Sequence, residues 1–289
     1  MARAKKAAES FEFVRLVENE RRAGPTLASV SRHWKQHEQK FLFLSPHDDD
    51  VVIGGGLMVQ SALAEGVPVH VAIVTDGAMG YCSPDQKETI RDVRRRETYA
   101  AYQALGVRRE DIHWLGFPDC RLTLYQGRQP AGPEEPAQSN GFTGLENAFT
   151  RLLRDVRPTQ VFLPTSADLH PDHRIVHAEL MISVFHAAGE IWPELGRPHT
   201  FVPYIHELAV YCNFPTPPKL RIRAPLSAFK RKMQAIREFE SQKQIKAIVE
   251  IIRRTGPWEY LRPLEFSLYH PSVYRDRFDE LPQMEELFG

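Results

Sequence analysis

Short apolar runs alternate with segments of helical periodicity from Lys40 onward. The apolar runs, which predict buried strands, are Phe41–Leu44, Val69–Val74, Ile112–Leu115 and Val161–Leu163. The segments between them predict helices over Val51–Glu65, Lys87–Leu105, Leu145–Val156 and Arg174–His186. Such alternation is typical of crossover units that feed a parallel sheet. It predicts an α/β fold of the Rossmann-like, doubly wound type, with a mainly parallel sheet and helices on both faces.

The two ends of the chain depart from this pattern. We expect residues 1–38 to form an N-terminal helical extension and residues 39–289 to form a single α/β domain with a C-terminal elaboration. The basic start is not followed by the apolar run of about 7–15 residues that a secretory signal needs. Inside the domain, Gln126–Gly144 is rich in Gly, Pro and Ser and predicts a long loop. The last third predicts an extended segment at Leu208–Asn213, a charged helix around Phe229–Lys246 and a final strand near Glu265–Tyr269.

Charge and cysteine usage narrow the possible partners. Lys plus Arg and Asp plus Glu number 37 each, so no net field attracts a nucleic acid or an acidic membrane. No stretch approaches the roughly 18 consecutive apolar residues of a membrane span. The three cysteines, Cys82, Cys120 and Cys212, are far apart and odd in number, which favours a reducing compartment over a disulfide framework. We therefore expect a cytoplasmic protein that binds neither nucleic acid nor membrane; the sequence predicts no oligomeric state.

The first apolar run ends in a cluster of polar groups. The sequence SPHDDD at positions 45–50 places His47 and the carboxylates of Asp48, Asp49 and Asp50 at the carboxyl end of a predicted strand, where open α/β sheets bind ligands. Three adjacent carboxylates repel one another unless they are solvated, protonated or neutralised by a cation. The cluster therefore indicates either a metal site or a solvated acidic turn in which an Asp caps the helix that begins at Val51.

A second cluster follows the fourth apolar run, again before a predicted helix. The sequence DLHPDH at positions 168–173 adds two imidazoles and two carboxylates at the same sheet edge. Catalytic zinc sites usually hold three protein ligands from His and carboxylates and keep one position for water, and His47, Asp50 and His173 supply that set. His177, four residues beyond His173, is an alternative ligand, and iron(II) is an alternative metal for two histidines and a carboxylate.

These clusters resemble the motifs of the PIG-L/LmbE-type family of zinc-dependent N-acetylglucosaminide deacetylases, which carry P-H-P-D-D early and H-P-D-H later. Further segments are similar to family motifs: VTDG at 74–77, RRRE at 94–97, LGFPD at 115–119, and KMQAI followed by SQ between 232 and 242. The similarity spans Phe41 to Gln242. It implies Zn²⁺ as the cofactor and a small-molecule N-acetylated amino sugar or glycoside as the partner.

The resemblance also implies a role for individual residues. By position it assigns zinc binding to His47, Asp50 and His173, the general base to Asp49, and oxyanion stabilisation or proton donation to His170. We expect Asp172 to orient the His170 imidazole, because a nearby carboxylate commonly holds such a ring. Arg94 and Asp119 are similar to family residues that face the bound sugar. Arg94 and Asp119 equally fit a solvated basic helix face and a turn cap. One position departs from the family pattern: Asp48 stands where proline is usual, and an unsolvated extra carboxylate there would raise the pKa of the neighbouring base.

Three other interpretations compete. Carboxylates after a strand, with Thr75 ending the next one, also fit a magnesium phosphotransferase of the haloacid-dehalogenase type, but that interpretation leaves His47 and DLHPDH unexplained. A non-catalytic carbohydrate-binding member of the family is a second possibility, although each proposed catalytic position holds a competent residue. A dinucleotide site is disfavoured because Gly54–Gly56 lacks the G-x-G-x-x-G spacing.

Overall fold

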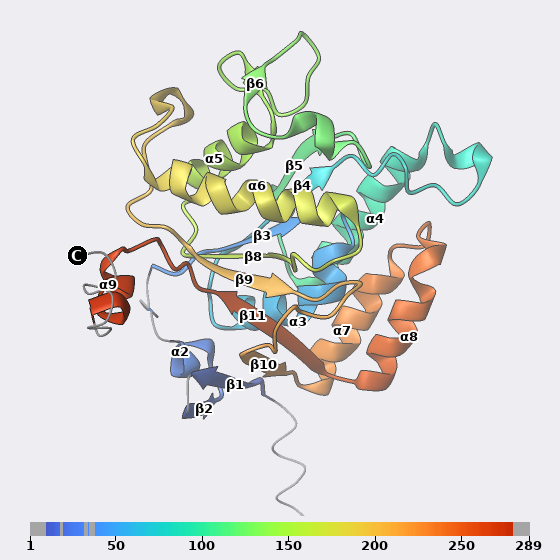
Figure 1. Ribbon diagram of the computed structural model, residues 1–289. Helices are drawn as coiled ribbons and strands as arrows, with labels where there is room; N and C mark the ends of the chain where they lie inside the picture. The colour runs from blue at the N-terminus through green and yellow to red at the C-terminus, as the bar shows by residue number, and fades with distance from the viewer. Residues whose placement is uncertain (1–9, 18–19, 32–33, 35–37, 280–289) are drawn as a thin grey trace, which may run out of the picture.

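A nine-stranded sheet forms the centre of the residues that the computed structural model describes, which are 10–17, 20–31, 34 and 38–279 (Figure 1). Its parallel half contains five strands: β3 (Phe41–Ser45), β4 (Val69–Thr75), β5 (Ile112–Phe117), β8 (Gln160–Pro164) and β9 (Tyr204–Leu208). Its antiparallel half contains four: β1 (Glu12–Val17), β2 (Glu20–Gly24), β10 (Leu220–Arg223) and β11 (Trp258–Leu264). The order across the sheet is β2-β1-β10-β11-β9-β8-β3-β4-β5. The sheet is thus mixed, and the prediction of a mainly parallel sheet holds for the half that contains β3.

Helices cover both faces of this sheet, as predicted. Their bounds are α2 (Leu27–Val30), α3 (Asp50–Ala64), α4 (Ile90–Leu105), α5 (Leu145–Val156), α6 (Pro171–Ala188), α7 (Leu226–Arg237), α8 (Lys246–Thr255) and α9 (Ser272–Asp279). The helices α3, α4 and α7 lie on one side of β3, and α5 and α6 lie on the other (Figure 1). Alternate residues of β3 enter the two cores between them: Phe41 and Phe43 belong to the first, and Leu42 and Leu44 to the second. A strand that is buried on both faces has a continuous apolar sequence, which is why the runs of β3, β4 and β8 were visible.

The predicted helical extension is wrong for the described part of residues 1–38. Glu12–Val17 and Glu20–Gly24 form an antiparallel hairpin, and β1 pairs with β10 in the central sheet. Phe13 is fully buried there, so pairing with a distant strand decides the local conformation. Residues 1–9 lie outside the described residues. The boundary at residue 38 stays a prediction.

The last third also differs from its predicted elements. The strands lie at β9 and β11, four to seven residues before the predicted Leu208–Asn213 and Glu265–Tyr269. The predicted helix Phe229–Lys246 is two helices, α7 and α8, interrupted near Ser241, whose backbone N–H and hydroxyl both bind the Glu97 carboxylate. The helix α7 has already ended at Arg237, and the bonds of Ser241 to Glu97 hold the non-helical segment that follows it. The predicted loop Gln126–Gly144 contains a two-stranded sheet of β6 (Gln129–Pro130) and β7 (Phe142–Thr143).

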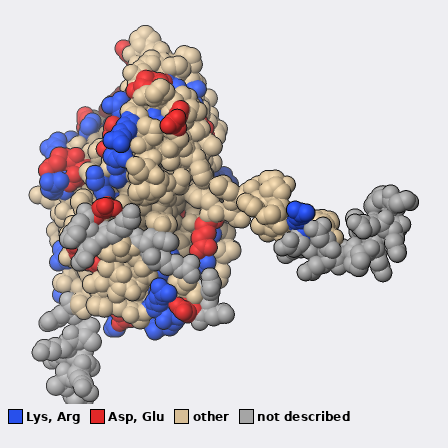
Figure 2. Space-filling view, turned by 90° about the vertical axis from the view of Figure 1, so that its left-hand side faces the viewer, with Lys and Arg blue, Asp and Glu red and all other residues tan. Residues whose placement is uncertain are grey.

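Charged side chains are dispersed over the surface. On the face shown in Figure 2, Lys and Arg are interspersed with Asp and Glu and do not gather into one patch of a single sign. Among the described residues, no helix is both long and apolar enough to cross a membrane.

Strand order determines where a site can form. From β3 the chain moves to β4 and β5 on one side, whereas β8 and β9 lie on the other side of β3. The order therefore reverses between β3 and β8, and the crevice at the carboxyl ends of these two strands is where open α/β sheets bind ligands. Both polar clusters predicted from the sequence follow these two strands.

Candidate active site

Two tight loops bring the polar clusters together. In the first loop, the hydroxyl of Ser45 donates to the His47 carbonyl and accepts from the Val51 N–H, while the His47 N–H donates to Asp50 Oδ2 over 2.7 Å. Asp48, Asp49 and Asp50 are at most 3% exposed, and Asp49, at the N-cap position of α3, makes no capping bond. The alternative of a solvated, capping acidic turn is therefore wrong.

Three side-chain atoms from the two loops converge on one point. His47 Nδ1 lies 3.2 Å from His173 Nε2 and 3.3 Å from Asp50 Oδ2, and His173 Nε2 lies 3.0 Å from Asp50 Oδ2. Ligands about 2.0–2.1 Å from a tetrahedral zinc ion are separated by about 3.3 Å, so the spacing fits a shared ion. The second oxygen of Asp50 is buried without a hydrogen bond within the described residues. The donor set and its spacing thus fit a metal.

The remaining nitrogens of both imidazoles face carboxylates. His173 Nδ1 lies 3.4 Å from Asp168 Oδ2, and His47 Nε2 lies 3.3 Å from Asp119 Oδ1 and 3.5 Å from Asp172 Oδ2. Metal-binding histidines usually direct their second nitrogen to such a carboxylate, which fixes the ring and its tautomer. The placement of Asp119 and Asp172 around His47 was not predicted.

Other ligand combinations also occur around His47. Among the described residues, ligand atoms of His47, His170 and His173 approach one another, as do those of His47, Asp119 and Asp172. Because His47 belongs to every combination, the structure indicates a possible metal site at this residue. His177 is not part of any of these groups; its Nε2 lies 2.9 Å from Glu207 Oε1.

The electrostatic environment of the site favours positive charge. Burial lowers the pKa of His47, but Asp50, Asp119 and Asp172 outweigh it, so that the net pKa is raised. Burial raises the pKa of Asp50, but His173 and His47 outweigh it and lower the net pKa. Burial raises the pKa of Asp49 to about 7, although Arg94 opposes the increase. A cluster of buried carboxylates that keeps its imidazoles charged is also one that stabilises a bound cation.

Asp48, in place of the usual proline, is paired with Arg94. The guanidinium donates from Nε to Asp48 Oδ2 over 3.1 Å and from Nη2 to Oδ1, and the hydroxyl of Thr98 donates to Oδ2 over 2.9 Å. Arg94 Nη2 also lies 3.6 Å from Asp49 Oδ1. A Cβ at position 80 would lie 2.1 Å from the guanidinium and would displace it. The extra carboxylate is therefore neutralised, and Arg94 is only 4% exposed rather than on a solvated helix face.

The two predicted catalytic partners from the second loop are less closely linked than expected. His170 is the N-cap of α6, and its Nδ1 accepts from the backbone N–H of Asp172 over 3.2 Å. The Asp172 carboxylate accepts from the Cys120 N–H over 2.9 Å and faces His47. The backbone of Asp172, rather than its carboxylate, therefore hydrogen bonds with the His170 ring.

Tyr211 is a site residue that the sequence did not reveal. Its ring stacks on His173 with centroids 5.3 Å apart and planes at 22°, and its N–H donates to Asp168 Oδ2 over 3.2 Å. Tyr211 follows β9 and lies outside both polar clusters, so only the pairing of β9 with β8 brings it here. Thr98 was missed for a similar reason, since a single threonine on a helix carries no motif.

Known proteins are similar to this chain in sequence and in fold. Residues 42–184 match the PIG-L family, described as GlcNAc-PI de-N-acetylase. Mycothiol S-conjugate amidase from Streptomyces coelicolor is 30% identical in an alignment of 190 residues that covers 60% of this chain and 60% of that protein. The match thus spans about three-fifths of this curated relative. The family match gives no support to the phosphotransferase or the non-catalytic alternative.

Solved structures extend the similarity to most of the fold. N,N'-diacetylchitobiose deacetylase from Pyrococcus horikoshii superimposes with a TM-score of 0.58 at 23% identity, covering 78% of this chain and 84% of that one. The 4-carboxy-2-hydroxymuconate hydratase GalB from Pseudomonas putida has a TM-score of 0.59 at 16% identity, covering 80% and 98%. At these identities the likeness concerns the fold alone, and the fold carries more than one chemistry.

Proposed function

Because this chain belongs to the PIG-L family through residues 42–184, we propose that it is a metal-dependent N-deacetylase of an amino sugar or glucosaminide. The reaction adds water to the acetyl carbon, breaks the bond between that carbon and nitrogen, and yields acetate and a free amine. The observation that carries the proposal is the convergence of His47, Asp50 and His173 within 3.3 Å of one another, beside the buried carboxylate of Asp49.

The proposed metal ligands are His47 Nδ1, Asp50 Oδ2 and His173 Nε2, and zinc is the proposed ion, with iron(II) as the alternative. A bound zinc ion polarises an amide carbonyl and makes a bound water more acidic. We prefer this set to those that include His170 or Asp119, because it leaves each ligating imidazole with a carboxylate partner at its other nitrogen.

Asp49 is the proposed general base. Its Oδ1 is buried and makes no hydrogen bond within the described residues, so it is available to a water at the site. Its raised pKa, near 7, suits a group that must take a proton and later release it. Arg94, 3.6 Å away, limits where this carboxylate can turn.

His170 is the proposed donor to the reacting amide. Because Nδ1 accepts from the Asp172 N–H, the neutral ring carries its proton on Nε2. From there the neutral ring donates a hydrogen bond to the developing oxyanion, and the proton that Asp49 takes from water is the one available to the leaving nitrogen. Asp172 supports this group through its backbone and supports His47 through its carboxylate.

Sugar binding by Arg94 and Asp119 stays a prediction. Both side chains are only 4% exposed and already engaged, Arg94 with Asp48 and Asp119 Oδ2 with the Met79 N–H over 3.1 Å. In the proposed complex their part is chiefly to hold Asp48 and His47 in place. The cytoplasmic location predicted from the cysteines is likewise part of this proposal.

The test combines metal analysis with acetate release. We expect about one zinc or iron ion per wild-type chain and acetate release from at least one N-acetyl glucosaminide. His173→Ala should lose both, whereas the matched control His177→Ala, one helical turn further on and bound to Glu207, should keep the metal. Metal content that is the same in all three proteins would exclude the proposed ligand set, and a metal-loaded protein that releases no acetate would exclude the reaction.

A further inference from the structure

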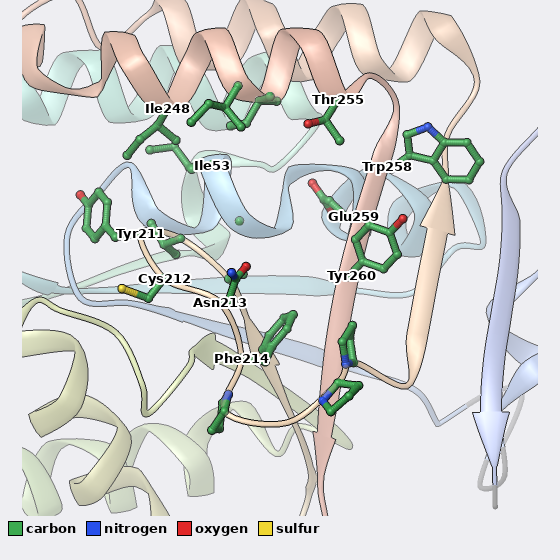
Figure 3. A pocket seen from close by; sticks show the side chains of 18 of the residues that line it. Ile53, Tyr211, Cys212, Asn213, Phe214, Ile248, Thr255, Trp258, Glu259 and Tyr260 are labelled. Atoms are coloured by element: carbon green, nitrogen blue, oxygen red, sulfur yellow. The ribbon is translucent and has the colours of Figure 1, made fainter.

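A groove of about 770 Å³ lies beside the proposed site (Figure 3). Its walls are the first turn of α3, the segment between β9 and β10, one side of α8 and the start of β11. Its large apolar and aromatic lining side chains include Tyr211, Phe214, Ile248, Ile252, Trp258 and Tyr260. This volume lies within the range of roughly 300–1,000 Å³ that small-molecule sites occupy.

The apolar side of α8 lines this groove, and Ile248 and Ile252 are only partly buried where they also meet the edge of the core. Ile248, Ile251 and Ile252 all line it, yet none of the residues of α8 is buried, and Ile251 is 64% exposed. Amphipathic helices normally bury such a stripe against the core. Figure 3 shows Ile248 and Thr255 on this helix opposite Ile53 of α3, with Phe214 and Tyr260 on the far side. The protein thus presents an apolar surface that its own described side chains do not fill.

The charged groups in the groove are already satisfied. Lys232 Nζ donates to Glu259 Oε1 over 2.6 Å, and the Glu259 carboxylate also accepts from the N–H groups of Leu57 and Met58. Both members of the pair are at most 5% exposed. A ligand therefore meets apolar and aromatic surface and no charge in need of a partner, which selects an uncharged apolar group.

Tyr211 connects the groove with the proposed site, whose metal-binding and catalytic side chains do not themselves line the groove. This residue lines the groove, and its ring stacks on His173 at 5.3 Å. Ile53, on the opposite wall, lies only three residues after Asp50 on the same helix. A molecule whose acetamido group reaches the site would extend along Tyr211 into the groove.

We propose that this groove binds the uncharged, apolar aglycone, aryl or alkyl, of the N-acetylated amino sugar, an inference that rests on the proposed function. Burial of one aromatic ring there is expected to lower KM by about ten-fold or more relative to the free sugar. The probes are 4-nitrophenyl N-acetyl-β-glucosaminide and N-acetylglucosamine. The metal-loaded full chain is used throughout, and acetate release is measured.

The decisive variant is Ile252→Glu, which places a carboxylate in the groove at a partly buried position of α8. We expect a rise in KM of at least ten-fold for the aryl glycoside, with kcat and the KM for N-acetylglucosamine within two-fold of wild type. Arg253→Glu, on a residue that does not line the groove, is the matched control and should leave both substrates unchanged. Equal effects of Ile252→Glu on the two substrates, or none, would overturn the inference.

A binding measurement separates this inference from the proposed reaction. A nitrophenyl group in the groove should quench the fluorescence of Trp258, and the loss of that signal in Trp258→Phe identifies its source. Quenching that is retained in Arg253→Glu and abolished in Ile252→Glu supports the groove even if neither substrate releases acetate, in which case only the reaction fails. If saturating glycoside does not quench the fluorescence of the wild-type protein, the inference that the groove binds the aglycone is wrong.

Discussion

Replacement of Arg94 by leucine should cost about 3 kcal/mol of unfolding free energy. The substitution leaves the carboxylates of Asp48 and Asp49, which are 3% and 2% exposed, without the only cation that bonds to Asp48 within the described residues. Removal of one partner from a buried ion pair typically costs about 3–5 kcal/mol, because the other charge stays buried. We expect the lower end of this range, since Thr98 still donates to Asp48.

Urea denaturation of the metal-loaded protein, with the m-value compared between variants, measures this loss. Asp48→Asn removes the extra charge and should cost less than Arg94→Leu. The double variant should be more stable than the sum of the two losses implies, by roughly 0.5–3 kcal/mol. A loss below about 1 kcal/mol in Arg94→Leu, or strictly additive effects, would refute the assignment of a coupled buried pair.

The same substitution should change the pH profile of acetate release. Arg94 lowers the pKa of Asp49, whereas burial raises it. Without the guanidinium the pKa of Asp49 rises further, so the base stays protonated to a higher pH. The acidic limb of the plot of kcat against pH should therefore move to higher pH in Arg94→Leu. An unchanged acidic limb would show that the ionisation of Asp49 does not control kcat.

Three further substitutions test other parts of the structure. Glu207→Gln should destabilise the protein at pH 7 by up to about 3 kcal/mol. Burial raises the pKa of Glu207, but hydrogen bonds from His177 and Arg262 outweigh it and lower the pKa to about 2. The stabilisation by the ionised carboxylate is therefore complete above pH 4.5 and is lost as the pH falls toward 2. Urea midpoints for the two proteins should therefore converge at acidic pH, and a constant difference would contradict the assignment. Gly54→Ala should lower stability by about 1–3 kcal/mol in the same assay, because its Cβ would meet a backbone carbonyl at 2.9 Å; an unchanged midpoint would show that α3 shifts freely. His170→Ala should retain the metal but lose roughly 10²–10⁴-fold in kcat, and a wild-type rate at saturating substrate would remove His170 from the mechanism.

The parallel half of the fold was predictable because its signals are local. The strands β3, β4, β5 and β8 each contain an apolar run, and the polar clusters follow two of these runs. His47, Asp50 and His173 could therefore be selected together from the sequence. The order of the strands then brings the clusters side by side. Spacing and topology are sufficient for this part of the site.

The rest depends on contacts between distant segments. The strand Glu12–Val17 carries two charged positions among apolar ones, and its conformation depends on its pairing with Leu220–Arg223. Nothing in the sequence shows that Arg94 faces Asp48, because the two residues are brought together by packing of α4 beside α3. Tyr211 reaches His173 only through the pairing of β9 with β8.

The pairing of β1 with β10 has a consequence for the order of folding. Glu12 and Arg221 form an ion pair across these strands, although 209 positions separate them in the chain. Closure of so large a loop is slow and entropically costly, whereas β3, β4 and β5 need only one helical crossover each. During synthesis the parallel half, with the first polar cluster, can form before β10, the partner of β1, has been made. Until β10 emerges from the ribosome, the first hairpin has no sheet to join and presents an open edge to other chains.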